Sequence, residues 1–453
     1  MRYLIFFFLL LVACVLPGFA QTPETLWTRS FGYADDDVGY DVNQTADSGY
    51  IIVGSANFDI YEEDVYLIKT DADGNTVWTE TYGWWDAHAR GYEVEQTLDG
   101  GYVIAVELNT HMPGVWWDVW IIKTDASGAM LWQQFYGMDN NQGAFSIQQT
   151  ADSGYIVAGY NSSGFEPDSF DIWLLKTDAN GDTVWTKTYG GALNDVAYSV
   201  KQTIDGGYIV AGNTFSFGVG TPDSGNMYLI KTDSLGDTLW TKTYGGLGSD
   251  LAYSVLQTSD SGYVVAGYTN SFGAGGFDVF LIRTDTYGDA VWTQTYGTSS
   301  NEIGRAIDLT HDSGFVIAGD DSDVLIIKTD SLGNEQWTKR VGGVELEYGW
   351  SVQQTADKGY IVAGATESYG AGGSDVYLVR LASDLNVKEN KIDSVFRRFH
   401  GATFTNGPIL LPEDKTCRVF DISGRQVTTY DVKPGIYFVE IEGRVTKKII
   451  KIK

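Results

Sequence analysis

Short runs in which apolar and polar residues alternate recur along most of the chain. One copy, residues 185–240, holds four such runs: Val196–Thr203, Tyr208–Ala211, Met227–Thr232 and Thr238–Tyr244. Alternation with a period of two predicts β-strands, and the period of an amphipathic helix is not present in this part of the sequence. The links Ile204–Gly207 and Asp233–Asp237 contain the Asp and Gly residues of tight hairpins. Each copy is therefore predicted to form a four-stranded antiparallel sheet.

A tryptophan marks each copy of this unit. It recurs at spacings of 51, 54, 53, 55, 52 and 45 residues, at Trp27, Trp78, Trp132, Trp185, Trp240, Trp292 and Trp337. Four strands repeated about every 50 residues are typical of the blades of a β-propeller, whereas the repeats of a β-solenoid, the alternative architecture, are usually shorter. We therefore predict an all-β fold, with a seven-bladed β-propeller over residues 21–385 and a small C-terminal β-sandwich.

The two ends of the repeat array predict how the ring closes. The chain begins with a lone fourth strand, Leu26–Phe31. The last copy has only its first three strands, Trp350–Thr355, Tyr360–Ala363 and Val376–Leu381. The strand numbers balance if the N-terminal strand completes the last blade. This closure would also remove an exposed sheet edge.

The recurring tryptophan is interpreted as a packing residue, because seven copies at a fixed spacing cannot form one active site. It follows an Asp-x-x-Gly turn, as in Asp178, Gly181 and Trp185. This arrangement resembles the docking tryptophan of pyrroloquinoline-quinone-type propeller repeats, and the resemblance extends over most of residues 22–385. It implies the propeller architecture. The sequence has no adjacent cysteine pair of the kind that the quinone dehydrogenases use, so their activity is not carried over.

The C-terminal residues follow a different pattern. Residues 386–406 are expected to form a linker, and short alternating strands predict a small antiparallel sandwich over residues 407–453. This segment resembles the type A sorting domain of the type IX secretion system through Val419–Val427, Pro434–Val439 and Lys447–Lys453. The resemblance implies export by a Gram-negative, Bacteroidetes-type bacterium, followed by surface display or release. An unrelated adhesive sandwich is the alternative.

Residues 1–20 have the parts of a removable export signal. Arg2 supplies a positive charge, Leu4–Leu16 is apolar, and Gly18–Ala20 offers a small-residue cleavage site. The apolar run is too short to span a membrane, and no transmembrane segment is expected elsewhere. A lipoprotein signal that would lipidate Cys14 is the alternative. The only other cysteine is Cys417, so the mature chain is expected to lack an internal disulfide.

The net charge narrows the choice of partners. The formal charge is −29, and residues 386–453 hold 13 Lys/Arg against 8 Asp/Glu, which leaves 17 basic and 51 acidic residues elsewhere. A propeller with this excess of acidic residues is expected to repel phosphate backbones and anionic membranes. We expect a secreted monomer with no nucleic-acid partner. Its expected partners are the type IX secretion machinery and, as a candidate ligand, a polysaccharide.

Two loops of the second repeat depart from the consensus. They carry seven aromatic, acidic or imidazole side chains: Trp84, Trp85, Asp86, His88, His111, Trp116 and Trp117. Both loops should project from the same face of a propeller. Exposed indoles stack on the apolar faces of sugar rings, and Asp or His can bond the hydroxyl groups. These residues are the predicted ligand site, and a hydrophobic plug beneath long loops is the alternative.

A carboxylate precedes the first strand in five repeats. These residues are Asp37, Asp195, Asp250, Glu302 and Glu347, whereas the other two repeats have Ala89 and Gln142. The first strand should be innermost, so the five carboxylates are predicted to ring the mouth of the central channel. Such a ring can hold a cation such as calcium. The alternative is that each carboxylate caps its own turn, and no other cofactor is expected.

Catalysis leaves little trace in the sequence, which contains no nucleophile elbow, phosphate-binding loop or zinc-ligand spacing. A glycosidase-like carboxylate pair stays open, with Asp86 and Asp118 as first candidates because they lie near the tryptophans. The leading hypothesis is a secreted or surface-displayed binding module for polysaccharide. A secreted glycan-cleaving enzyme and a structural or adhesion protein are the alternatives.

Overall fold

The structure, a computed structural model, describes residues 22–59, 62–84, 87–110, 117–137, 141–162, 169–221 and 224–384, and five strands after residue 400. The chain divides into two units, Met1–Asp384 and Leu385–Lys453. All regular elements of the described residues are β-strands, which confirms the predicted fold class. No helix in these described ranges is long and apolar enough to cross a membrane.

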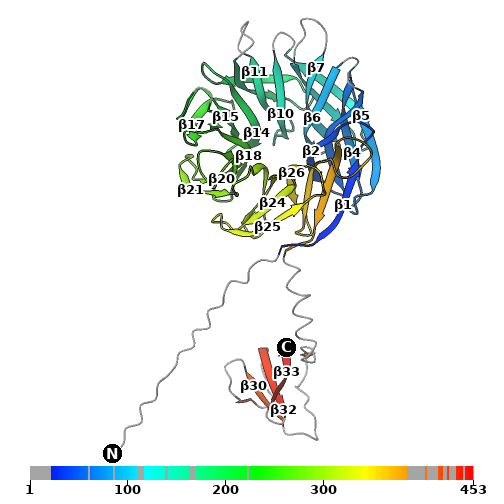
Figure 1. Cartoon of the computed structure of the whole chain (residues 1–453), viewed down its shortest axis with the longest axis vertical. Helices are drawn as coiled ribbons and strands as arrows, with labels where there is room; N and C mark the ends of the chain where they lie inside the picture. The colour runs from blue at the N-terminus through cyan, green and yellow to red at the C-terminus, as the bar shows by residue number, and fades with distance from the viewer. Residues whose placement is uncertain are drawn as a thin grey trace, which may run out of the picture. The chain divides into compact units, whose positions relative to one another are not determined.

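The first unit is a β-propeller of seven four-stranded antiparallel blades around a common centre (Figure 1). A single parallel bridge, Glu63 to His88, joins the sheets of blades 1 and 2. Blades 1 to 3 consist of β2 (Asp37–Gln44), β3 (Tyr50–Asp59), β4 (Glu62–Thr70) and β5 (Thr76–Tyr82), then β6 (Ala87–Gln96), β7 (Tyr102–Thr110), β8 (Trp117–Thr124) and β9 (Met130–Tyr136), then β10 (Gln142–Gln149), β11 (Tyr155–Ser162), β12 (Phe170–Thr177) and β13 (Thr183–Tyr189).

The remaining blades repeat the same order from the innermost to the outermost strand. Blades 4 to 6 consist of β14 (Asp195–Gln202), β15 (Tyr208–Thr214), β16 (Asn226–Thr232) and β17 (Thr238–Tyr244), then β18 (Asp250–Gln257), β19 (Tyr263–Thr269), β20 (Asp278–Thr284) and β21 (Ala290–Tyr296), then β22 (Ile303–Leu309), β23 (Phe315–Asp320), β24 (Val324–Thr329) and β25 (Glu335–Val341). Blade 7 contains β26 (Glu347–Gln354), β27 (Tyr360–Thr366) and β28 (Asp375–Leu381).

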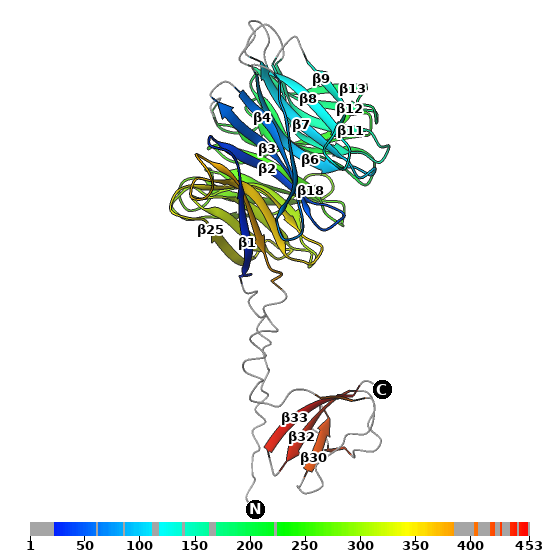
Figure 2. The same cartoon turned by 90° about the vertical axis from the view of Figure 1, so that its right-hand side faces the viewer.

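The N-terminal strand β1 (Thr25–Phe31) closes the ring. It pairs antiparallel with β28, so blade 7 has the strand order β1-β28-β27-β26. Figure 2 shows β1 in dark blue beside the orange and yellow strands of this blade. The predicted closure is therefore confirmed, and backbone hydrogen bonds between the two ends of the propeller hold the ring shut.

The hydrophobic core lies between neighbouring blades. Leu174 of blade 3 and Val210 of blade 4 belong to one such cluster, and both are fully buried. Trp185 on the outermost strand of blade 3 packs edge-on against Tyr208 of blade 4, with ring centroids 5.8 Å apart. The turn of blade 4 comes so close that a Cβ on Gly236, which has a φ of +79°, would lie 3.0 Å from the Trp185 ring. This confirms that the recurring tryptophans pack one blade against the next.

The second unit contains one five-stranded sheet with the order β29-β33-β32-β30-β31. Its strands are β29 (Thr403–Thr405), β30 (Cys417–Asp421), β31 (Gln426–Val427), β32 (Gly435–Ile441) and β33 (Arg444–Lys451). β29 lies inside the range predicted as a linker. It joins the sheet by parallel pairing with β33. The sheet therefore begins before residue 407.

Candidate functional site

A β-bulge in the innermost strand of every blade shapes the centre of the propeller. In blade 1 the register shifts between Gly39 and Asp41, so that Tyr40 is the extra residue. The other six inner strands have the same shift at the equivalent place. A bulge re-aims a side chain and breaks the strict alternation of a strand. The bulged residue and its successor consequently both line a central cavity of about 580 Å³ in all seven blades.

The seven bulged residues form a closed ring, which we call the aromatic belt. They are Tyr40, Tyr92, Phe145, Tyr198, Tyr253, Arg305 and Trp350. Successive aromatic rings have centroids between 4.8 and 5.3 Å apart. Arg305 fills the one place without an aromatic ring, with its guanidinium carbon 5.6 Å from the Tyr253 centroid and 3.8 Å from the Trp350 centroid. A stacked guanidinium thus continues the belt.

Arg305 is neutralised within its own blade. Its Nε lies 2.5 Å from Oδ1 of Asp320, and both side chains are 11% exposed. In blade 2 the belt residue Tyr92 instead donates a hydrogen bond to Glu107, which also accepts one from the hydroxyl of Tyr160. Burial raises the pKa of Glu107. Polar groups behind the belt therefore fix its side chains at several points.

Side chains next to the belt cap the free edge of the neighbouring inner strand. An innermost strand is paired on one side only, so its outward N–H groups need other acceptors. Ser146 Oγ accepts from the N–H of Val200 at 3.1 Å, and Gln148 Oε1 accepts from the N–H of Gln202 at 2.6 Å. Three further neutral side chains cap the adjacent blade in the same way: Ser199, Ser351 and Gln353. The cavity wall thereby links blade to blade.

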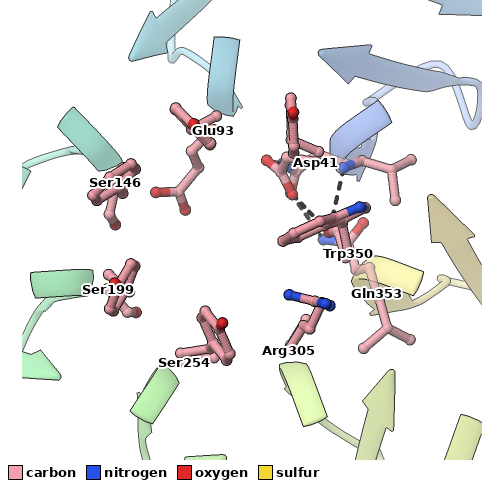
Figure 3. Close-up of a pocket in the computed structure, with 18 of the residues that line it drawn as sticks. Asp41, Glu93, Ser146, Ser199, Ser254, Arg305, Trp350 and Gln353 are labelled. Atoms are coloured by element: carbon pink, nitrogen blue, oxygen red, sulfur yellow. Dashed lines mark hydrogen bonds between the residues drawn. The ribbon is translucent and has the colours of Figure 1, made fainter. Parts of the chain in front are cut away.

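Four carboxylates perform the same capping in other blades. They are Asp41, Glu93, Glu95 and Asp308, which accept from the N–H groups of Val94, Ile147, Gln149 and Gln354. Figure 3 shows Asp41, Glu93 and Arg305 around the same space, with Ser146 next to Glu93 and Ser254 next to Arg305. Burial raises the pKa of Asp41 to about 6, that of Asp308 to about 6 and that of Glu95 to about 7. The wall of the cavity thus combines neutral capping side chains in some blades with carboxyl groups in others.

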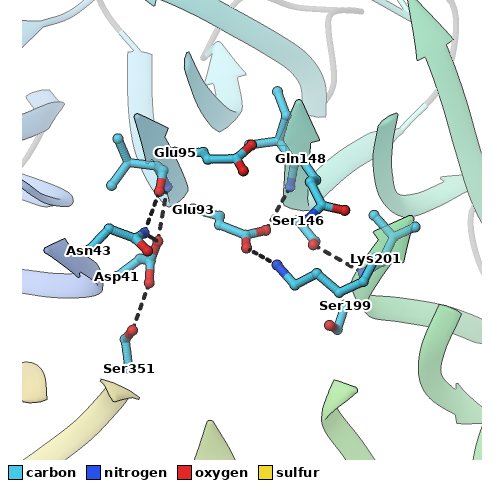
Figure 4. Close-up of polar contacts among 12 residues, drawn as sticks. Asp41, Asn43, Glu93, Glu95, Ser146, Gln148, Ser199, Lys201 and Ser351 are labelled. Atoms are coloured by element: carbon cyan, nitrogen blue, oxygen red, sulfur yellow. Dashed lines mark hydrogen bonds and ion pairs between the residues drawn. The ribbon is translucent and has the colours of Figure 1, made fainter. Parts of the chain in front are cut away.

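Lys201 is the basic residue of this acidic wall. Its ammonium reaches from blade 4 past blade 3 to Glu93 of blade 2, where Nζ lies 2.7 Å from Oε1 (Figure 4). Burial lowers the pKa of Lys201, but the adjacent Glu93 outweighs this effect and raises it overall. Apart from the Arg305–Asp320 pair, four carboxylates therefore face one ammonium group.

The structure describes only part of the predicted site on blade 2. Trp84 is 46% exposed and packs edge-on against Phe135, with centroids 5.3 Å apart. Trp117 is half-buried at the start of β8, and His88 Nδ1 lies 3.5 Å from a carboxylate oxygen of Glu63. The other predicted residues, Trp85, Asp86, His111 and Trp116, lie outside the described residues. Ligand binding at these loops stays a prediction.

The five carboxylates before the inner strands are buried and bonded to their own loops. Each accepts a hydrogen bond from a backbone N–H four residues earlier in the chain: Asp37, Asp195, Asp250, Glu302 and Glu347. All are at most 2% exposed, and none lines the central cavity. These contacts are those of the turn-capping alternative. Among the described residues no group of three His, Cys, Asp or Glu side chains is placed to hold a metal, so calcium binding stays a prediction.

Sequence reasoning missed the belt, and of its two catalytic candidates the structure describes only Asp118, since Asp86 lies outside the described residues. Asp118 is only 6% exposed at the start of β8. The belt residues carry a weak signal, because an aromatic side chain precedes a small or acidic residue in most inner strands, as in Tyr198-Ser199. A single strand read alone does not reveal which of these two residues faces the centre.

Comparison with known proteins supports the fold. No protein-family model matches the chain. It is 27% identical over 184 residues to the regulatory protein FlaEY of Caulobacter vibrioides, which covers 35% of this chain and only 19% of that protein. Raptor of Chaetomium thermophilum matches with a TM-score of 0.50 at 10% identity, over 79% of this chain and 29% of that one. The WD40 β-propeller domain of Doa1 has a TM-score of 0.49 at 13% identity, over 80% and 97%. The fold shared with the Raptor structure is that of a β-propeller.

Proposed function

We propose that this chain is an exported β-propeller module that binds an extracellular polysaccharide, with a sugar unit seated in the central cavity. The aromatic belt is the observation that carries the proposal. It surrounds a cavity of about 580 Å³, within the range of small-molecule sites. Apolar ring surfaces and hydrogen-bonding side chains such as Ser254 and Gln353 alternate along its wall. Sugars require both kinds of contact.

The loops of blade 2 extend this proposed site. The β5–β6 link, described as far as Trp84, precedes the inner strand of blade 2, and Tyr92 of the belt is the sixth of the ten residues of that strand. The indole of Trp84 is 46% exposed and packs against Phe135 on the outermost strand of blade 2. A polysaccharide that places one unit in the cavity is therefore proposed to continue over blade 2.

Export is the second part of the proposal. The leader over residues 1–20 and the resemblance of residues 407–453 to a sorting domain support it. The experiment is to express the full chain and a chain ending at Asp384 in a bacterium that has a type IX secretion system. We expect only the full chain on the cell surface or in the medium. Equal secretion of both chains would overturn this export route.

Glycan binding is tested with the mature chain on an array of plant, algal and bacterial polysaccharides, with released sugars assayed in the same wells. We expect binding without release. Tyr198→Ala removes one ring of the belt, and Tyr287→Ala, on a turn where the residue is 71% exposed, is the matched control. Loss of binding only in Tyr198→Ala supports the cavity. Release of sugars would favour the glycan-cleaving enzyme, and no binding to any glycan would overturn the proposal.

A further inference from the structure

The cavity carries more negative charge than capping requires. In blade 3, Gln148 accepts the N–H of the next inner strand at 2.6 Å, whereas in blade 2 the equivalent residue Glu95 accepts the same bond. Closer to the belt, Ser146 of blade 3 and Glu93 of blade 2 are also equivalent: each accepts a hydrogen bond from an N–H of the next inner strand. Neutral side chains therefore suffice for closing the ring, and the carboxylates add a charge that the fold does not need.

Most of this charge has no cation beside it. Lys201 pairs with Glu93 at 2.7 Å, and Arg305 pairs with Asp320. Asp41, Glu95 and Asp308 are in no ion pair among the described residues; each interacts with the distant ammonium of Lys201 only through space. Hydrogen bonds satisfy their oxygens, but burial raises the pKa of all three carboxyl groups, so a cation in the cavity would stabilise their ionised forms.

The chain itself shows which cation the wall accommodates. The ammonium of Lys201 crosses the width of blade 3 to reach the acidic side, so an alkylammonium group is already held against Glu93. The rings of Tyr40, Tyr92 and Phe145 line the same cavity, and the electron-rich faces of aromatic rings attract cations. The pairing of the Lys201 ammonium with Glu93 and the aromatic ring system are two separate features of one cavity.

Resting on the proposed function, we propose that the cavity recognises a protonated amine on its ligand, held between the aromatic belt and the carboxylates Asp41, Glu95 and Asp308. An amino sugar with a free amine, such as glucosamine, has this chemistry together with a ring for the belt. A free polyamine has the amine alone. The formal charge of −29 on the chain attracts either one.

The experiment is calorimetric titration of the mature chain at fixed ionic strength with three probes. They are a β-1,4-linked glucosamine tetramer, the same tetramer fully N-acetylated, and spermidine. Glu95→Gln removes one charge and keeps the capping acceptor, as Gln148 does in blade 3. Glu80→Gln removes the same charge from the exposed strand β5 and is the matched control. Asp308→Asn is a second variant from another blade.

We expect the glucosamine tetramer to bind, the N-acetylated tetramer to bind at least about tenfold more weakly, and Glu95→Gln to weaken amine binding by about tenfold while Glu80→Gln leaves it unchanged. Equal affinity for the two tetramers would overturn the amine site and leave the glycan function standing. Binding of spermidine with neither tetramer would keep the amine site and count against the glycan function. Amine binding unaltered in both Glu95→Gln and Asp308→Asn would be attraction to the acidic surface alone and would overturn the inference, as would no binding of any amine.

Discussion

Replacing Asp320 by Asn tests how strictly the aromatic belt needs its one ion pair. Arg305 and Asp320 are each 11% exposed, and the guanidinium carbon lies 3.8 Å from the Trp350 centroid. Removing one partner of a buried pair leaves a charge without a counter-ion, which costs about 3 to 5 kcal/mol. Stacking on Trp350, worth about 2 kcal/mol, is the same in both proteins and does not offset the loss. We expect Asp320→Asn to lower the free energy of unfolding by about 3 kcal/mol.

A double variant separates the effect of the unpaired charge from the effect of the changed side-chain shapes at Arg305 and Asp320. Arg305→Tyr with Asp320→Asn gives blade 6 side chains that other blades already use, namely a tyrosine in the belt and an asparagine at the place of Asn213. It should recover most of the lost stability. All 14 tryptophans precede residue 385, so their fluorescence during urea unfolding reports on the propeller alone. If Asp320→Asn stays within about 1 kcal/mol of the wild type, or the double variant is no more stable than the single one, the reasoning is wrong.

Four further outcomes are expected in the same unfolding assay. Deleting residues 22–31 removes β1, so the cooperative transition should broaden and move to lower urea; an unchanged midpoint would contradict closure by this strand. Asp312→Ala removes the carboxylate from the buried ammonium of Lys328, which keeps Thr329 O and Gln336 Oε1 as acceptors, and should cost about 2 kcal/mol, with partial recovery on adding Lys328→Met. Leu309→Gln should gain about 1 kcal/mol, because a glutamine at this position accepts a turn N–H at six other junctions. The raised pKa of Glu95, about 7, makes its ionised form unfavourable in the fold, so stability should fall as pH rises from 4 to 7, and less so in Glu95→Gln.

The sequence pattern predicted the strands well where side chains alternate without interruption. The outer strand Thr238–Tyr244 has the predicted bounds, whereas β15 continues past the predicted Tyr208–Ala211 to Thr214. The extension is polar, and its pairing with Asn226 and Met227 across the sheet sustains it. Such pairing depends on a second strand and is not visible in the first one alone.

The candidate site was harder to predict, because it depends on register. The inner strand was expected to be regular over Val196–Thr203, but the bulge between Ala197 and Ser199 turns Tyr198 and Ser199 toward the same side. Asp195 precedes this bulge in the same strand. It is bonded to its own loop and does not line the cavity, unlike Tyr198 and Ser199 after the shift. Carboxylates predicted at the channel mouth thus serve the loops, and the channel carboxylates went unnoticed.

The contrast between uniform and variable positions explains how a repeated fold can acquire one site. The outer tryptophan contacts the next blade through ring packing, which only a large flat side chain provides, and it is present in all seven repeats. An inner-edge cap needs only an acceptor for an N–H group, so serine, glutamine, aspartate and glutamate serve equally well at this place. Three of these positions even carry a side chain that cannot accept, at Lys201, Leu256 and Ala306. Ring closure does not fix the charge of the cap, so blades 1, 2 and 6 can concentrate carboxylates at the centre without loss of the propeller. The proposed ligand site depends on this freedom.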